Sequence, residues 1–210
     1  MEIHPFVLGS FEVSAYVVVA DGRAAVVDAP EGSEVLIEFC DARGLAPDIL
    51  VNTHGHGDHI FANALLRKRW PEMAIAIGKA DGPMLGSPFR NLSAVMGSWV
   101  KSPKADRLLE DGDRIEVGSA AFEVLATPGH TRGGISLYTP EGPDGRPAVF
   151  TGDALFAGGI GRTDFPWSSH KTLLESIRKR LLALAPETVV YPGHGPPTTV
   201  GDEARGNPWL

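Results

Sequence analysis

Residues 54–59 of this 210-residue chain read His-Gly-His-Gly-Asp-His, directly after a short apolar stretch. Side chains alternate in direction along extended backbone, so His54 and His56 point to one side and can bind one ion. Asp58 and His59 begin a predicted helix, whose positive N-terminal end favours an ionised aspartate and a neutral imidazole, the forms that bind metal. The two glycines allow backbone torsions that other residues resist. The segment therefore predicts a metal site between a strand and a helix.

Three further polar residues follow predicted strands, each directly after a glycine: His130, Asp153 and His194. We expect ligands at the ends of several strands to converge on one sheet edge, where rigid elements hold them. Together with residues 54–59 they offer five imidazoles and two carboxylates, and no sulfur. This donor set suits Zn²⁺, Fe²⁺ or Mn²⁺, and seven candidate ligands favour two ions over one.

The hydrophobic pattern predicts short strands first and then strands linked through helices. Helical spacing indicates three helices, at 33–44, at about 58–69 and at 170–183. Strands are expected at 2–8, 15–20, 24–28, 48–52, 74–77, 114–117, 121–126, 135–139, 148–151 and 189–191. Two mixed sheets packed on each other with helices outside both, an α/β (α+β) fold, satisfy this order. No regular element is predicted for the 79–106 segment. Three roles stay open for it: a lid over the substrate, a dimer contact or ordinary loop packing.

Composition narrows the partners and the location. The chain has 19 Lys and Arg against 26 Asp and Glu, a net charge of −7. Nucleic acids and anionic membranes require a clustered basic face, so we expect neither as a partner. The single cysteine, Cys40, excludes an intramolecular disulfide and fits a reducing cytoplasm. The longest apolar run, 15–20, is far shorter than the ~20 residues of a membrane span, and no basic residue precedes Arg23, which argues against a secretory signal.

The 53–59 segment with His130, Asp153 and His194 resembles the ligand set of the metallo-β-lactamase-fold superfamily, and the resemblance extends over most of the chain. Residues 159–164 and 192–208 are similar to hydroxyacylglutathione hydrolases (glyoxalase II), particularly the short bacterial type. The resemblance implies a four-layer αβ/βα sandwich forming one domain over 1–210. It also implies two groups of metal ligands with Asp153 bridging both ions: His54, His56 and His130 on one, and Asp58, His59 and His194 on the other.

The activity implied by this resemblance is hydrolysis of a small-molecule thioester such as S-lactoylglutathione. A hydroxide bridging two divalent ions would attack the carbonyl, with zinc as the first expectation and iron or manganese as alternatives. Asp58 would be catalytic, both ligating and orienting the hydroxide. A thioester fits because a thiolate leaves without strong acid assistance. We expect Asp28 to support a ligand imidazole, and Arg162 either to anchor a substrate carboxylate or to form a salt bridge with Asp164.

Other activities stay open at this point. Persulfide dioxygenases are also similar to this chain, and their single iron would be held by His54, His130 and Asp153. A lactonase or β-lactamase would use the same hydroxide chemistry, and a binding protein without turnover would use the metal only for stability. Glyoxalase II of full length carries a C-terminal helical extension that binds glutathione, whereas 16 residues follow His194 here. The glutathione-binding part is thus expected to be missing or built elsewhere, and the oligomeric state is left open.

Overall fold

The apolar run of strand β2 (Val13–Ala20) is buried on both faces. Ala15 and Val17 face a core shared with helices, whereas Tyr16 and Val18 face a second core between two sheets. Successive side chains of a strand point to opposite faces, so a strand that is apolar throughout can be buried on both faces. The strand is therefore part of an inner layer, covered by helices on one side and by a sheet on the other.

The structure, a computed structural model, describes all residues 1–210. Its first sheet has six strands in the order β1 to β6, antiparallel from β1 to β3 and parallel from β3 to β6. Besides β2, its strands are β1 (Glu2–Leu8), β3 (Arg23–Val27), β4 (Pro47–Asn52), β5 (Ala74–Gly78) and β6 (Arg107–Leu109). Helices α1 (Glu34–Ala42) and α3 (Asn63–Arg69) cover its outer face with Leu36 and Leu66.

The second sheet also has six strands, in the order β14-β13-β10-β9-β8-β7, with β10 and β13 as its parallel pair. These strands are β7 (Arg114–Val117), β8 (Ala120–Ala126), β9 (Ile135–Thr139), β10 (Ala148–Gly152), β13 (Val189–Pro192) and β14 (Thr198–Thr199). Its outer face packs against α4 (His170–Ser176), a π-helical turn (Ile177–Leu181) and α5 (Val200–Gly206). Smaller elements are the β11 (Leu155–Phe156) and β12 (Gly159–Ile160) hairpin, and the 3₁₀ turns Lys79–Met84 and Pro143–Gly145.

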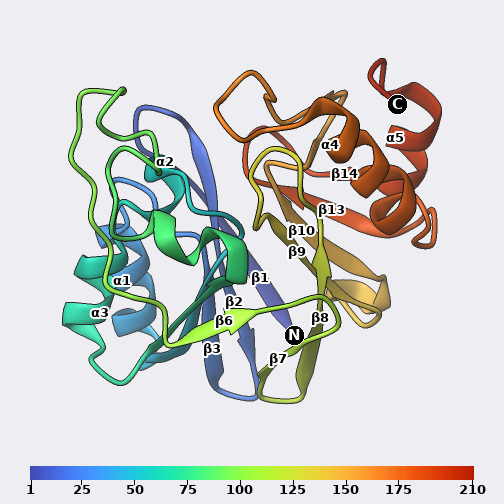
Figure 1. Cartoon of the computed structure of the whole chain (residues 1–210). Coiled ribbons are helices and arrows are strands. Elements are labelled where there is room, and N and C mark those ends of the chain that lie inside the picture. Colours follow the sequence, from blue (N-terminus) through green and yellow to red (C-terminus); the bar gives the residue numbers. More distant parts are fainter.

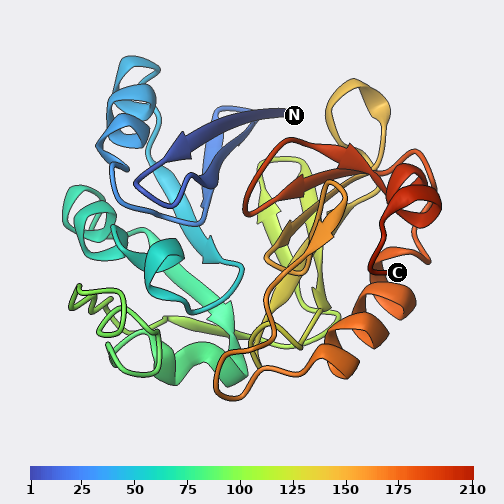
Figure 2. The same ribbon diagram turned by 90° about the horizontal axis from the view of Figure 1, so that it is seen from above.

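The expected fold of two mixed, face-to-face sheets with helices outside both is confirmed (Figure 1). Seen from above, the two sheets lie side by side and the helices form the outer layers (Figure 2). One apolar cluster lies between the two sheets and one lies between each sheet and its helices, so the four layers enclose three cores. None of the helices has the length and apolar character that a bilayer-spanning segment requires.

The helix expected at 58–69 is divided into α2 (Gly57–Ile60) and α3. The cause is a pair of backbone hydrogen bonds to a distant segment: the N–H of Ala29 donates to His59 O at 2.8 Å, and the N–H of Ala62 donates to Ala29 O at 2.8 Å. These bonds divert backbone groups from the helical ladder. The division holds His59 in a buried position, with its side chain fully enclosed.

The sequence patterns missed β6, β14, the β11–β12 hairpin and α5. Helix α5 begins after Thr199, whose hydroxyl accepts the N–H of Asp202, an N-cap arrangement. Inside it, Glu203 is buried and accepts hydrogen bonds from Gly158 N and Asn207 Nδ2. The C-terminal residues therefore fix the β11–β12 hairpin, which lies between Asp153 and Arg162.

Candidate metal centre

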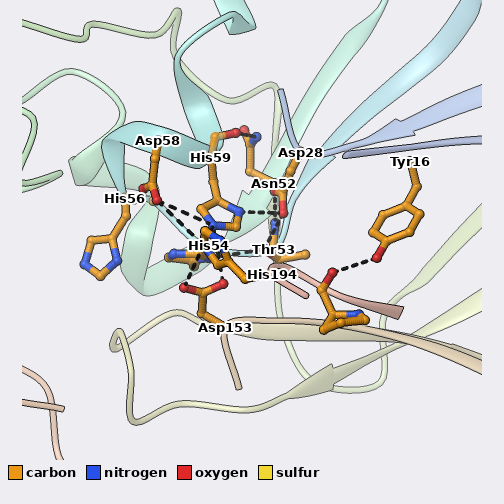
Figure 3. A network of polar contacts seen from close by, with 12 residues as sticks. Tyr16, Asp28, Asn52, Thr53, His54, His56, Asp58, His59, Asp153 and His194 are labelled. Atoms are coloured by element: carbon orange, nitrogen blue, oxygen red, sulfur yellow. Dashed lines mark hydrogen bonds and ion pairs between the residues drawn. The ribbon is translucent and has the colours of Figure 1, made fainter. Parts of the chain in front are cut away.

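The seven predicted ligands come together at one edge of the sandwich, just beyond the C-terminal ends of four strands. Figure 3 shows this place with His54, His56, Asp58, His59, Asp153 and His194 labelled. Strand β4 leads into residues 54–59, and β8, β10 and β13 lead to the three ligands downstream: His130, Asp153 and His194. Strands from both sheets therefore supply donors to the same place. Such positioning on strand ends gives the side chains a rigid support.

The first donor group consists of His54, His56 and His130, whose ligand atoms lie within 4.8 Å of one another. Nδ1 of His56 is 2.9 Å from Nε2 of His130. Nε2 of His54 is buried and has no hydrogen-bond partner. A buried nitrogen without a partner is costly, and a bound cation would satisfy it.

The second group, Asp58, His59 and His194, also has its ligand atoms within 4.8 Å. The Nε2 atoms of His59 and His194 are 3.4 Å apart, and Asp58 Oδ2 is 3.9 Å from each of them. The side chain of His194 is 28% exposed, so this group is accessible to solvent on one side.

Asp153 lies between the two groups. Its Oδ1 is 3.3 Å from Nε2 of His59, and its Oδ2 is 3.5 Å from Nε2 of His130 and 3.6 Å from Nε2 of His194. Oδ1 is buried and accepts no hydrogen bond. One carboxylate thus faces imidazoles of both groups, as a bridging ligand would.

A second set of contacts orients the imidazoles. Asp28 Oδ2 is 2.9 Å from Nδ1 of His59, which leaves Nε2 of that ring to face the donor cluster. Nδ1 of His130 donates to the carbonyl oxygen of Arg162 at 2.7 Å, which leaves Nε2 of His130 to face the same cluster. Such partners fix the ring orientation of metal-binding histidines.

The pKa values of the cluster residues shift in different directions. Burial and neighbouring imidazoles hold the pKa of His54 well below its usual value and lower that of His56 to about 3, so both rings are neutral at pH 7. Burial also acts to lower the pKa of His59, but the carboxylates of Asp153, Asp28 and Asp58 together raise it. Burial acts to raise the pKa of Asp153, but its imidazole neighbours hold it well below the usual value. At pH 7 the cluster therefore combines the neutral rings of His54 and His56 with the ionised carboxylate of Asp153, and the raised pKa of His59 shows that its position favours positive charge.

The donors fit divalent ions. They are nitrogen and oxygen atoms only, they form three overlapping groups, and two buried atoms among them, on His54 and Asp153, have no hydrogen-bond partner. Zn²⁺, Fe²⁺ and Mn²⁺ accept such mixed imidazole and carboxylate sets.

Gly55 and Gly57 are expected to provide backbone torsions that other residues resist, but neither residue has a positive φ. Instead, residues of the 79–106 segment lie directly against them. A Cβ on Gly55 would be 2.7 Å from Cβ of Met84, and a Cβ on Gly57 would be 2.7 Å from Cβ of Ser93. The N–H of Gly57 also donates to Asn91 O at 2.7 Å. The glycines thus permit close approach of the overlying segment.

Asp81 is a residue of this site that the sequence patterns missed. Its side chain is fully buried and accepts the N–H groups of Gly55 at 3.1 Å and Gly133 at 2.7 Å. It therefore ties the 54–59 segment to the loop that follows His130. It lies three residues after the buried strand β5, but it follows Ala80 and so lacks the preceding glycine that singled out His130, Asp153 and His194.

The side chains of Arg162 and of the histidines His4 and His170 make their contacts outside the donor cluster. The Arg162 guanidinium forms an ion pair with Asp164 at 2.8 Å, so a role in substrate binding stays a prediction. His4 lies beside Glu2 at 2.7 Å and packs against Phe39. His170 begins α4 and is exposed.

The family model described as the metallo-beta-lactamase superfamily matches residues 8–194. The protein named hydroxyacylglutathione hydrolase GloC of Haemophilus influenzae is 35% identical to the chain over 194 residues, which cover 90% of this chain and 87% of that protein.

Two solved structures are similar over almost the whole chain. The BLEG-1 B3 metallo-beta-lactamase superposes with a TM-score of 0.92 at 32% identity, covering 100% of this chain and 99% of that one. TTHA1623 in a di-iron-bound form superposes with a TM-score of 0.87 at 38% identity, covering 99% of this chain and 100% of that one. Both solved structures therefore share the architecture of this chain.

Proposed function

Because the chain belongs to the metallo-beta-lactamase superfamily, a superfamily of metal-dependent hydrolases, we propose that it cleaves a thioester such as S-lactoylglutathione with two divalent ions. The observation that carries this proposal is the convergence of five imidazoles and two carboxylates in overlapping groups. The similarity to a protein named hydroxyacylglutathione hydrolase supports the choice of substrate class.

In this proposal His54, His56 and His130 hold one ion, Asp58, His59 and His194 hold the other, and Asp153 contacts both. Ions bound there would polarise the substrate carbonyl and lower the pKa of water toward neutrality. Zinc is the first candidate, and the di-iron form of a similar structure supports iron as an alternative.

Asp58 is the proposed catalytic residue. Its side chain is 13% exposed, and its Oδ2 lies 3.9 Å from Nε2 of both His59 and His194. From this position the carboxylate accepts a hydrogen bond from the attacking water and orients it toward the substrate. The departing thiolate needs no strong acid, because a thiol has a pKa of about 8.5.

A persulfide dioxygenase would need only His54, His130 and Asp153 around one iron. The proposal of a hydrolase is favoured because His56, Asp58, His59 and His194 lie within ligand distance of the same cluster. A lactonase would use the same donors and differs only in substrate. We also propose one domain over residues 1–210 and a cytoplasmic location, and both stay predictions.

The decisive experiment measures metal content and hydrolysis together. Protein purified without added metal should contain two equivalents of a divalent ion and hydrolyse S-lactoylglutathione. His56→Ala and Asp153→Ala should each lose bound metal and nearly all hydrolysis, whereas His170→Ala, on the surface, should keep both. Full activity and unchanged metal in either of the first two variants would contradict the proposal. One equivalent of iron with oxygen consumption on a persulfide would support the dioxygenase instead.

A further inference from the structure

A pocket of about 310 Å³ adjoins the first donor group and is lined by His56 and His130. Its volume lies at the small end of the range of about 300–1,000 Å³ for ligand sites. One wall comes from the 79–106 segment, with Met84, Arg90 and Leu92, and another from Arg132 and Trp167. A molecule reacting at the metal centre would have one arm in this pocket.

Two of the lining residues, Arg90 and Arg132, are exposed arginines, and neither is among the arginines that form ion pairs within the chain. The acid in the lining, Asp81, is buried, and its two oxygens accept backbone N–H groups. Two arginines without carboxylate partners therefore line the same space. Guanidinium binds carboxylate and phosphate groups through paired hydrogen bonds.

A second pocket, beside Asp58 of the second donor group, has the opposite charge. It has a volume of about 220 Å³ and is also lined by Glu31, with Phe11, Phe61 and Met96 as apolar walls. No arginine or lysine lines it. Charge complementarity thus directs an anionic arm to the pocket with Arg90 and Arg132, and leaves the second pocket to an uncharged group.

The backbone of the arginine-lined pocket is strained at two places. Leu92 has φ 64° and Trp167 has φ 71°, a left-handed conformation that is unusual for bulky side chains. Both residues line this pocket. Strain of this kind gathers where a loop must present particular groups to a ligand.

From these observations we infer that Arg90 and Arg132 bind an anionic thiol carrier, the leaving-group part of the thioester. This inference rests on the proposed function. The carriers that fit this pocket have an anionic group, either a carboxylate or a phosphate, several bonds from the scissile carbonyl. Glutathione has such carboxylates, and coenzyme A has such phosphates. Arg162, which pairs with Asp164, is not among the residues lining this pocket.

The test compares one acyl group on three carriers. S-lactoyl esters of glutathione, coenzyme A and the uncharged N-acetylcysteamine are assayed with the metal-loaded wild type and with Arg90→Gln, Arg132→Gln and the double variant. We expect kcat/KM on the preferred anionic carrier to fall about fivefold in each single variant and about 20-fold in the double, mainly through KM. Activity on N-acetylcysteamine should change less than twofold, and lysine at either position should restore part of the loss. Arg178→Gln, an exposed arginine in the π-helical turn without an ion pair, is the matched control.

Two kinetic outcomes would overturn the inference: wild-type kcat/KM on the uncharged carrier equal to that on both anionic ones, or an equal loss on all three carriers in the double variant. The relative activity on the glutathione and coenzyme A thioesters identifies the carrier.

A binding measurement by calorimetry, with S-methylglutathione and with coenzyme A, gives a readout without hydrolysis. The Kd for at least one of these ligands should rise about tenfold in the double variant. A wild type that hydrolyses no thioester but shows this arginine-dependent binding would refute the proposed function alone. Absence of binding, or a Kd unchanged by the substitutions, refutes the role of the arginines.

Discussion

Oδ2 of Asp28 lies 2.9 Å from Nδ1 of His59, and the same carboxylate accepts hydrogen bonds from the backbone N–H and the hydroxyl of Thr53. Asp28 is 1% exposed, so these contacts form away from water. One buried side chain thus links the end of β4 to an imidazole of the donor cluster, and it fixes which nitrogen of that imidazole faces the other donors.

Asp28→Asn should weaken metal binding about 10- to 100-fold, because it removes the charged partner that orients His59. Asparagine tolerates the left-handed conformation at this position, φ 59°, so the backbone should persist. Competition with a chelator of known affinity measures the effect. Asp48→Asn, which removes the exposed partner of Arg23, is the control and should leave affinity unchanged. Equal affinity in both variants would show that Asp28 only secures the strand end.

Gly57→Ala should lower the free energy of unfolding by about 1–3 kcal/mol, because its Cβ would overlap Ser93. The ideal Cβ would lie 2.7 Å from Cβ of Ser93 and 3.3 Å from Asn91 O. Urea denaturation checks this value. Gly86→Ala is the matched control, since a Cβ there meets no atom within 4 Å. A similar stability of the two variants would mean that the overlying segment yields to the added methyl group.

Tyr16→Phe should destabilise the protein by about 1 kcal/mol or somewhat more, since it leaves a buried carbonyl without its donor. The hydroxyl of Tyr16 donates to Pro192 O at 2.6 Å, joining the two sheets. Burial raises the pKa of Tyr16, so the hydroxyl stays protonated and this bond should persist into alkaline solution. Tyr138→Phe, at a half-buried tyrosine of β9, serves for comparison in the same denaturation experiment. The idea fails if both variants unfold at the same urea concentration.

Removal of metal with a chelator should lower the thermal midpoint of unfolding. At a free ion concentration 1,000 times the Kd, binding stabilises the folded state by about 4 kcal/mol. Thermal scans with and without chelator measure the difference. The shift should be largely lost in His194→Ala and retained in His170→Ala. A wild-type midpoint that does not respond to the chelator would argue against a resident ion.

The patterns that predicted correctly were local ones. Continuous apolar runs such as that of β2 identify strands buried on both faces. A glycine followed by a histidine or aspartate after a strand predicts His130, Asp153 and His194 as donors, and the structure brings these three side chains to one place. The interruption of the helix at Phe61 escaped prediction because it depends on hydrogen bonds with Ala29, more than thirty positions away. The arginine-lined pocket could not be predicted for the same reason. Arg90 and Arg132 belong to no common local pattern, and only the tertiary structure brings them to one pocket.

The turn at 110–113, between β6 and β7, separates the two sheets along the chain. Each of the three donor groups takes two members from the residues before this turn and one from the residues after it. Neither portion alone carries a complete group, and each would expose one bare apolar sheet face. A polypeptide cut at this turn would therefore give two fragments, and a complete donor group would form again only when the two apolar faces reassociate.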